Sequence, residues 1–377
     1  MMPHEFNLVR RILKERSGIE LGADKMDLVE AKLRPLVKEL EFPSFAHFIL
    51  ALMKPDADKL RSRVAQAVAV LESYFYRDRT PFEYFTGVML PRLMERRGAS
   101  RRIRIWCAAV STGQEAYSLA MLLEEAKSQL VGWKVEIVAT DFVGDALLRA
   151  KNGVYSQFEV QRGLPVSKLV RYFVKVTNGW QIKPELRARV DFREHNLIDN
   201  CQELGEFDVI FCRNVLIYFD ERLKSAVLSR LAGQLASDGY LVLGAAETTS
   251  GLSPDFVPVP EGRHGVFCLA PAVIAARIGR MERTGRLRAS GPRAALPSGG
   301  QSRVGMGLAS LDRPATVAPI RDSKVRAVEL DAKTAGLLEA RARARGMSVA
   351  ELLAEFAVTG LPVSEGLPGR SLKAGSS

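Results

Sequence analysis

Between residues 101 and 247 the sequence alternates short apolar segments with longer amphipathic ones. The apolar segments have the β-branched and aromatic content of buried strands and lie at residues 102–110, 133–142, 189–196, 207–219 and 238–247. The amphipathic segments repeat apolar residues at helical spacing, which predicts helices over 115–130, 144–153 and 220–235. Because strands that alternate with helices form parallel sheets covered on both faces, the pattern predicts an α/β fold with a doubly wound, Rossmann-like sheet.

One connection is too long for a plain helical crossover. Residues 153–189 separate the second predicted helix from the third strand, whereas connections in α/β units are usually far shorter. Within this stretch, Asn178-Gly179 is a strong turn signal between two strand-like runs. We therefore predict a small inserted β-subdomain at about 153–189 that contains a hairpin.

The first hundred residues have helical spacing. The segments that carry it are 6–18, 24–40, 44–53 and 58–75. They predict an N-terminal helical domain over residues 1–90, followed by the sheet domain over residues 91–270. Pro35 lies inside the second segment, where its missing N–H should kink or end the helix.

Composition excludes several classes of protein. The sequence has no apolar run of membrane-spanning length, and its first residues lack the apolar core of a signal peptide. We therefore expect a cytoplasmic chain without membrane insertion. Cys107, Cys201, Cys212 and Cys268 lie far apart and form no C-x-x-C pair. They are expected to be reduced, buried thiols, and the sequence predicts no metal site.

The net charge of +11 comes mostly from the C-terminal part, where residues 271–377 carry 17 basic and 9 acidic side chains. Residues 271–322 have the composition of a flexible basic linker, and residues 362–377 that of a disordered tail. Between them, residues 323–361 show a strand, a helix and a second helix, a pattern similar to ribbon-helix-helix units. DNA contact, self-association and a chance helical hairpin all remain open for this segment.

The first strand turns into the first helix through Ser111-Thr112-Gly113. Such a turn gathers backbone N–H groups and the positive end of a helix, which suits nucleotide-like ligands, although the glycine-rich dinucleotide fingerprint is absent. Asp141 ends the second strand, where a carboxylate can accept both hydroxyls of a ribose or can cap a helix. Glu115, in the first turn of the helix, belongs to the same site or simply interacts with the helix dipole.

The other strand ends also carry polar residues. Asn196 and Leu197 follow the third strand, and Arg213, Asn214 and Tyr218 interrupt the apolar run of the fourth. Buried polar groups without partners are costly. These residues therefore form either a binding site at the carboxyl edge of the sheet or an internal polar network.

Six motifs in register resemble the chemotaxis receptor methyltransferases of the CheR type: ESYFYRD, AAVSTGQEAYSLA, ATDF, VDFREHNLID, FDVIFCRNVLIYFD and GYLVLGAAE. The resemblance covers roughly residues 5–270, including the helical domain and the insert. It implies a protein-glutamate O-methyltransferase that uses S-adenosylmethionine to esterify glutamates on the cytoplasmic helices of chemoreceptors. A regulator that senses the cofactor and binds DNA or dimerises through its C-terminal module is the alternative, and a small-molecule or RNA methyltransferase is a third.

The resemblance also implies site residues. Those that would bind the cofactor are Ser73, Arg77, Glu115, Asp141, Asn196, Leu197, Asn214 and Val215. Arg77 and Tyr218 would be catalytic, the first orienting the substrate carboxylate and the second hydrogen-bonding near the transferred methyl group. Without the resemblance, Arg77 would be expected to pair with Asp78 or another acid, and Tyr218 to be a core aromatic. Leu71 stands where the family usually has Asn, and Ser73 where it has Thr, so one polar contact to the cofactor is lost.

Two features bear on the receptor partner. Lys32, Arg34 and Lys38 have the helical spacing of one basic region for docking on an acidic receptor helix. The family members that bind a receptor's C-terminal pentapeptide carry a longer glycine-containing loop than the VKVTNG segment at 174–179 here. We therefore predict receptor methylation that is independent of this tether.

Overall fold

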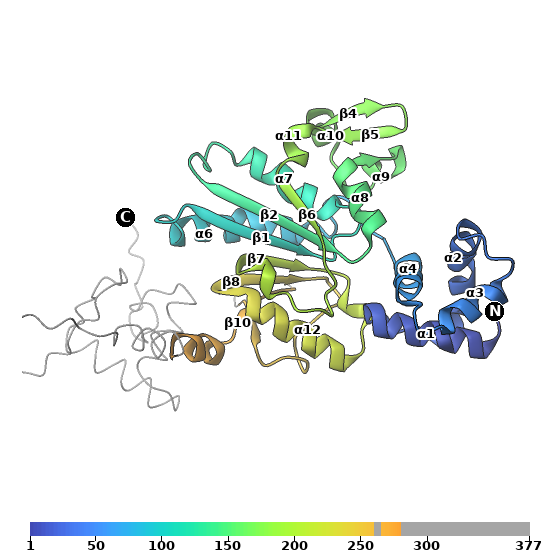
Figure 1. Cartoon of the computed structure of the whole chain (residues 1–377). Coiled ribbons are helices and arrows are strands. Elements are labelled where there is room, and N and C mark those ends of the chain that lie inside the picture. The colour runs from blue at the N-terminus through green and yellow to red at the C-terminus, as the bar shows by residue number, and fades with distance from the viewer. Residues whose placement is uncertain (260–264, 280–377) are drawn as a thin grey trace, which may run out of the picture. The chain divides into compact units, whose positions relative to one another are not determined.

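The computed structural model describes residues 1–259 and 265–279 (Figure 1). The chain divides into two compact units, Met1–Ile274 and Ala275–Ser377. All elements that form the main sheet, and the pocket at its edge, belong to the first unit.

Most of the predictions made for the C-terminal part concern residues that the structure does not describe. Residues 271–279 are helical. The rest of the predicted linker, the segment similar to ribbon-helix-helix units at 323–361 and the predicted tail at 362–377 lie outside the described residues. Within the described ranges, no helix is both long and apolar enough to cross a membrane.

The centre of the first unit is a mostly parallel sheet. In the described part of the chain, its seven strands lie in the order β6-β2-β1-β7-β8-β10-β9, and β10 is antiparallel to both of its neighbours. The strands are β1 (Arg102–Ala108), β2 (Lys134–Asp141), β6 (Val190–Glu194), β7 (Phe207–Cys212), β8 (Leu235–Leu243), β9 (Phe256–Pro258) and β10 (Val266–Leu269). The predicted doubly wound α/β sheet is confirmed, whereas its last two strands, β10 and the edge strand β9, were not predicted.

Helices cover both faces of this sheet. Successive strand residues face opposite sides, so Ile105 and Cys107 share a core with α7 (Gln114–Glu125), while Trp106 and Ala108 share one with α12 (Glu221–Gln234). The two helices lie on opposite sides of the strands (Figure 1). The other helices and helical turns near the sheet are α5 (Thr80–Tyr84), η2 (Phe85–Met89), α6 (Leu90–Arg96), α8 (Gly144–Asn152), η3 (Gln202–Leu204) and η4 (Leu216–Tyr218).

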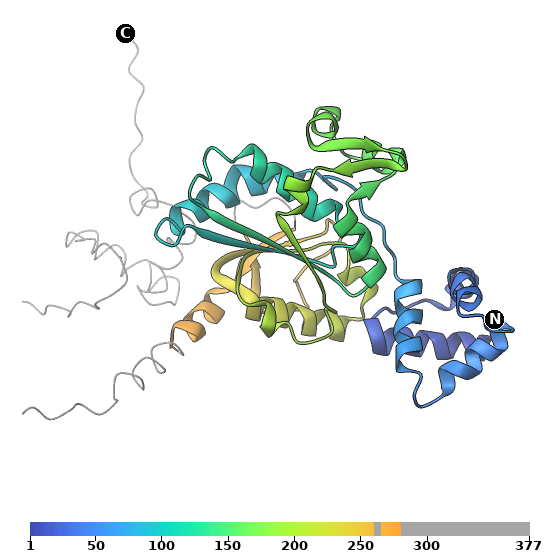
Figure 2. The same cartoon turned by 45° about the horizontal axis from the view of Figure 1, so that its top comes forward.

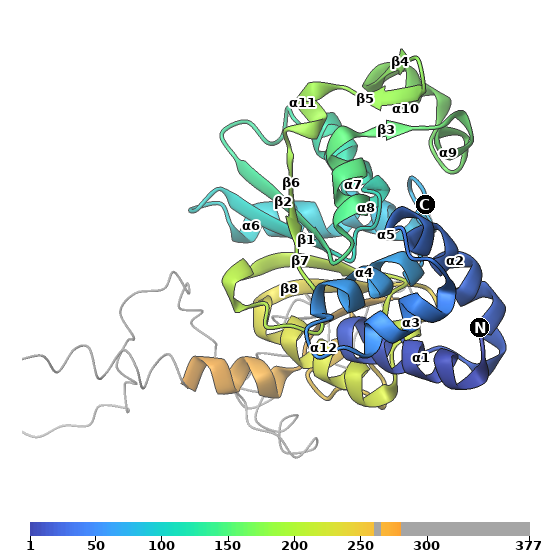
Figure 3. The ribbon, with the colours of Figure 1, turned by 45° about the vertical axis from the view of Figure 1, so that its right-hand side comes forward.

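The N-terminal helices have a core of their own. They are α1 (Pro3–Ser17), η1 (Ala23–Lys25), α2 (Met26–Glu39), α3 (Phe45–Met53) and α4 (Asp58–Val68). The start of α12 lies beside α1, where Lys14 Nζ is 2.8 Å from Asp220 Oδ2 (Figure 3). Of the two outcomes expected at Pro35, a kink or an end of the helix, the second does not occur: α2 continues to Glu39, and Leu33 and Leu36 on either side of Pro35 are both buried in this core.

The fourth predicted helix is shorter than its periodicity suggested, since α4 ends at Val68 and not at Phe75. Val64 and Val68 pack in the core of the N-terminal helices, whereas Phe75 packs in a core of the main sheet. One straight helix does not serve both cores. The chain therefore leaves the helix after Val68 and continues to the carboxyl edge of the sheet.

The long connection between α8 and β6 folds as a small antiparallel sheet, as predicted. Its elements are β3 (Val154–Tyr155), α9 (Gln157–Gln161), α10 (Val166–Tyr172), β4 (Phe173–Val176), β5 (Gly179–Ile182) and α11 (Pro184–Arg187), with strand order β3-β5-β4. The hairpin of β4 and β5 stands clear of the main sheet (Figure 2). Position 179 requires glycine, because its φ is +139° and a Cβ there would lie 2.2 Å from the carbonyl oxygen of Tyr155.

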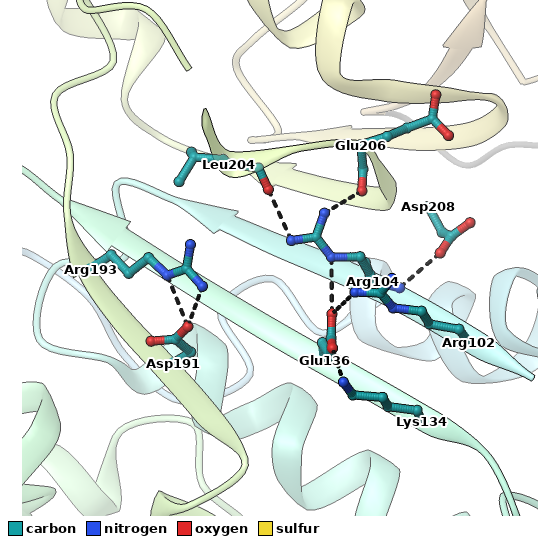
Figure 4. Close-up of polar contacts among 9 residues, drawn as sticks. All are labelled: Arg102, Arg104, Lys134, Glu136, Asp191, Arg193, Leu204, Glu206 and Asp208. Atoms are coloured by element: carbon teal, nitrogen blue, oxygen red, sulfur yellow. Dashed lines mark hydrogen bonds and ion pairs between the residues drawn. The ribbon is translucent and has the colours of Figure 1, made fainter. Parts of the chain in front are cut away.

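The amino-terminal edge of the main sheet is closed by ion pairs (Figure 4). Arg104 donates to Glu136 at 3.0 Å, and its backbone N–H donates to Asp208 at 2.8 Å. Lys134, aided by Arg102, lowers the pKa of Glu136 from its usual value to about 2. The charges at this edge therefore have partners within the protein and stabilise the strand pairing.

Lys32 is not part of a free basic surface. Its Nζ donates to the carbonyl oxygens of Val68 and Ala69, each at 2.8 Å, at the C-terminal end of α4. Carbonyls at a helix end lack intrahelical partners and favour a nearby cation. The predicted basic region is therefore wrong for Lys32, while Arg34 is ion-paired along its own helix and Lys38 is exposed.

We expect Lys32→Ala to lower the free energy of unfolding by about 1 kcal/mol, because two half-buried carbonyls lose a charged donor. Lys38→Ala is the matched control, and we expect its effect to stay within about 0.5 kcal/mol. Urea denaturation followed by circular dichroism measures both. Equal effects for the two lysines would contradict the assigned role of Lys32.

Candidate functional site

One pocket lies at the carboxyl edge of the main sheet, and every predicted site residue lines it. These residues are Ser73, Arg77, Glu115, Asp141, Asn196, Leu197, Asn214, Val215 and Tyr218. They come from the segment after α4, the first turn of α7, the end of β2 and the loops that follow β6 and β7. Parallel strands bring their carboxyl ends to one edge, which is why positions far apart in the sequence meet here.

The turn between β1 and α7 is tightly wound. Ala109, Ser111 and Gly113 all have positive φ, with Gly113 at +95°. A Cβ at Gly113 would lie 2.9 Å from the Cβ of Ala150, so the position requires glycine. The hydroxyl of Ser111 is buried at the pocket and has no hydrogen-bond partner among the described residues. The turn thus offers the pocket an unused polar atom.

Asp141 joins two turns at the pocket wall. Its Oδ2 accepts from the N–H of Ser111 at 2.8 Å, and its Oδ1 accepts from the N–H of Val143 at 2.9 Å. Burial raises the pKa of Asp141, and these two N–H groups oppose the rise. Since a carboxylate oxygen can accept more than one hydrogen bond, Asp141 retains acceptor capacity toward a ligand.

Arg213 is buried, with its side chain 2% exposed, and links two parts of the pocket. One amino group donates to Glu115 at 3.0 Å, and the other donates to Asp78 at 2.7 Å and to the carbonyl oxygen of Arg77 at 2.9 Å. Burial raises the pKa of Glu115, and Arg213 acts against this rise. Glu115 is therefore held by an ion pair in addition to its place at the start of α7.

The structure bears on the simpler roles considered for Arg77 and Tyr218. Asp78 pairs with Arg213, while Arg77 donates to the carbonyl of Glu72 at 3.2 Å and lies over the Tyr74 ring. Among the described residues, no ion pair joins Arg77 to Asp78. Tyr218 is half-buried and lines the pocket, in contrast to a fully buried core aromatic.

The polar residues after β7 follow the strand and do not interrupt it, because β7 ends at Cys212 and not at residue 219. Asn214 has a φ of +58°, which ends the extended backbone. Its side-chain Oδ1 is buried without a partner in the described structure. The apolar run that follows forms the helical turn η4, which carries Tyr218 at its end.

Sequence reasoning missed Glu247, which holds this loop. Its carboxylate accepts the backbone N–H groups of Asn214 at 2.8 Å and Val215 at 2.9 Å. The signal in the sequence was an acidic residue shortly after the apolar strand β8. It stands in the motif GYLVLGAAE, which was used only for its resemblance to the family.

The N-terminal helices complete the pocket. Ser17 and Ile19, at the end of α1, line it. The amide of Asn196 donates to the carbonyl of Arg16 at 2.7 Å, and the N–H of Glu20 donates to the carbonyl of Tyr218 at 2.9 Å. The side-chain N–H of Asn196 is thus engaged in joining the two domains.

Family models match most of the first unit. The model described as CheR methyltransferase, SAM binding domain, matches residues 71–263, and that described as CheR methyltransferase, all-alpha domain, matches residues 4–68. This chain belongs to the CheR methyltransferase family. The cofactor of this family's domain is S-adenosylmethionine. All residues that line the pocket, except Ala69 and Val70, lie within the matched ranges.

Two similar proteins are both named chemotaxis protein methyltransferases. Chemotaxis protein methyltransferase 1 of Pseudomonas aeruginosa is 39% identical over 267 residues, which are 70% of this chain and 96% of that protein. Chemotaxis protein methyltransferase Cher2 of Pseudomonas putida is 36% identical over the same shares. Among solved structures, magnesium protoporphyrin IX methyltransferase from Synechocystis with bound SAM aligns at 12% identity and a TM-score of 0.27, over 66% of this chain and 85% of that one.

The residues of the CheR pocket fit the cofactor chemically. Glu115 and Asp141 supply carboxylates for an ammonium group and for ribose hydroxyls. Leu197 and Val143 supply apolar side chains against which the adenine ring of the cofactor can pack. The unpartnered oxygen atoms of Ser111 and Asn214 match a ligand rich in polar groups. Buried polar atoms of this kind gain hydrogen bonds when a ligand enters, which favours binding.

We expect Asp141→Asn to weaken the binding of S-adenosylhomocysteine by about tenfold or more. An amide keeps the size of the side chain but turns one acceptor into a donor that faces a backbone N–H and no longer accepts from ribose. Calorimetric titration measures the affinity, and circular dichroism checks the fold. Unchanged affinity in the folded variant would remove Asp141 from the site.

Proposed function

We propose that this CheR methyltransferase transfers the methyl group of S-adenosylmethionine to glutamate side chains on the cytoplasmic helices of chemoreceptors. The observation that carries the proposal is the pocket in which all the expected cofactor residues meet Arg77 and Tyr218. The names of the two Pseudomonas relatives, both chemotaxis protein methyltransferases, supply the substrate class. The product would be a glutamate methyl ester.

The reaction requires no general base. A glutamate side chain has a solution pKa of about 4.3, so it is already anionic and nucleophilic at pH 7. When bound, S-adenosylmethionine would supply a methyl group bonded to a positively charged sulfur. An anionic oxygen can accept this methyl group as the carbon–sulfur bond breaks and S-adenosylhomocysteine leaves, and no proton has to be transferred. The protein must therefore orient one carboxylate oxygen, remove its water and keep it ionised.

Arg77 suits the orientation of the incoming carboxylate. Arg77 is half-buried at the pocket, and its guanidinium donates to the backbone carbonyl of Glu72. A planar guanidinium offers several donors in a fixed geometry, and these match the two oxygens of a carboxylate. Its positive charge also keeps a partly desolvated glutamate ionised.

Tyr218 suits the role of a hydrogen-bond donor at the same place. Burial raises the pKa of its phenol, so the hydroxyl stays protonated and can donate throughout the neutral range. The backbone of Tyr218 is fixed by the N–H of Glu20. A fixed donor next to the reacting carboxylate limits the number of its orientations and so favours reaction.

We expect Arg77→Ala to lower kcat/KM for receptor methylation by ten- to a hundredfold, as for the loss of a charged hydrogen bond, and Tyr218→Phe to lower kcat by about tenfold. The assay incubates purified protein with labelled cofactor and receptor-containing membranes, then tests whether the label is released by base, as a carboxyl ester should be. Lys127→Ala serves as the control, because this exposed lysine follows the end of α7 that points away from the pocket. Parental rates for both variants would exclude this catalytic pair, and label that base does not release would exclude the proposed ester.

We further propose that receptor binding needs no C-terminal pentapeptide tether. The β4–β5 hairpin has only Thr177 and Asn178 between its strands, so it lacks the longer loop expected of tethered members. β4 is nevertheless an edge strand of the small sheet. An edge strand can pair with an extended peptide through its backbone, which is the competing possibility.

Titration of the full chain with receptor C-terminal pentapeptides decides between these possibilities. We expect no saturable binding in the micromolar range, that is, nothing near −8 kcal/mol. A scrambled pentapeptide is the control for nonspecific pairing. Micromolar binding of the native peptide that maps to residues 170–185 would contradict the proposal.

The regulator alternative has no support from the relatives found. Its DNA-binding or dimerising module lies at 323–361, outside the described residues. Self-association or DNA contact through that segment stays a sequence-based expectation.

A further inference from the structure

We infer that Glu247 is a positioning residue that shapes the loop carrying Asn214, Val215 and Tyr218. The expected effect of Glu247 on turnover rests on the proposed function, whereas its expected effect on cofactor affinity does not. Its carboxylate accepts backbone N–H groups from both sides of the crossover between β7 and β8. These groups are Gly244 N at 2.7 Å and Asn214 N at 2.8 Å on Oε2, and Val215 N at 2.9 Å and Ile217 N at 3.3 Å on Oε1.

Glu247 itself does not line the pocket, whereas Asn214, Val215 and Tyr218 do. It is 8% exposed. A buried carboxylate is costly unless several donors satisfy it, and here backbone N–H groups do so. Glu247 can therefore influence the reaction through the shape of the loop, and through space its charge also raises the pKa of Glu115 and of Tyr218.

The loop depends on an anion at this point. Asn214 holds a φ of +58°, which costs a non-glycine residue roughly 1 kcal/mol or more. Around it, the N–H groups of Asn214, Val215 and Ile217 converge on one position and repel one another unless an acceptor sits between them. Glu247 supplies that acceptor and so holds Asn214, whose Oδ1 is buried without a partner in the described structure, in the wall of the pocket.

Gly244 provides an independent way to disturb the same contact. A Cβ at this position would lie 2.7 Å from Nδ2 of Asn214 and 2.8 Å from Oε2 of Glu247. Alanine would therefore push the carboxylate and the loop apart without removing either. If Glu247 acts by positioning, Gly244→Ala and Glu247→Gln should have the same consequences.

A matched control exists at the other end of β7. Asp208 is also a buried carboxylate, 7% exposed, and accepts a backbone N–H, that of Arg104, at 2.8 Å. It lies at the amino-terminal edge of the sheet (Figure 4). Asp208 also pairs with Arg97 at 2.8 Å. Asp208→Asn therefore weakens an ion pair as well as a backbone contact, and it should cost stability as Glu247→Gln does but leave the loop at the pocket in place.

The experiment compares the full-length parent with Glu247→Gln, Gly244→Ala and Asp208→Asn. Calorimetry gives the affinity for S-adenosylhomocysteine, thermal unfolding gives Tm, and the receptor assay gives kcat and KM for the cofactor. A displacement of about 1 Å at a reacting centre can cost roughly a hundredfold in rate. We expect Glu247→Gln and Gly244→Ala to weaken affinity at least about tenfold and to lower kcat by ten- to a hundredfold. Asp208→Asn, at a comparable loss of Tm, should change both by less than about threefold.

Two results would overturn the inference. One is parental affinity and kcat in folded Glu247→Gln. The other is a loss in Asp208→Asn as large as that in Glu247→Gln, because function would then simply follow stability. If the parent methylates no receptor, the proposed function fails, yet the affinities for S-adenosylhomocysteine still decide the role of Glu247.

Discussion

The buried guanidinium of Arg213 is the contact on which the site depends most. It joins the carboxylates of Asp78 and Glu115 and holds the backbone carbonyl of Arg77. Asp78 has positive φ, as do its neighbours Tyr76 and Arg79, so this segment adopts a conformation that non-glycine residues rarely take. Removing one member of a buried ion pair leaves an uncompensated charge, typically at a cost of about 3–5 kcal/mol. Arg213 therefore fixes the strained segment that brings Arg77 to the pocket.

The second constraint is that the pocket needs both family domains. The segment after α4 has to leave the core of the N-terminal helices and reach the core of the sheet, and in doing so it delivers Ser73 and Arg77. Hydrogen bonds across the junction fix its width, since Asn196 holds the end of α1 and Gln66 donates to the carbonyl of Phe142 at 3.0 Å. The N-terminal helices are thus part of the site wall as well as a candidate receptor surface.

The local sequence pattern was sufficient to predict those elements whose structure follows from a single hydrophobic period or a single buried face. The strands before Cys212, the helices that cover the sheet and the hairpin at Asn178-Gly179 follow from spacing and turn chemistry. The failures have a tertiary cause. The end of α4 is set by two separate cores, and the end of β7 is set by Glu247, 33 residues beyond Asn214. The location of the site could be predicted from the polar residues at the strand ends. The contact of Lys32 with the end of a neighbouring helix could not, because no periodicity in the sequence indicates it.

The two edges of the sheet use polar groups in opposite ways. At the amino-terminal edge, charged side chains such as Arg104 and Glu136 find partners within the protein (Figure 4). At the carboxyl edge, within the described structure, the Oγ of Ser111, the Oδ1 of Asn214 and the Nε of Arg213 are buried without partners. Each such atom lowers the stability of the unliganded protein, by roughly 1–3 kcal/mol for a neutral group that water does not reach. A ligand that satisfies these atoms recovers that free energy as affinity, so the edge that is less stable alone is the one suited to bind.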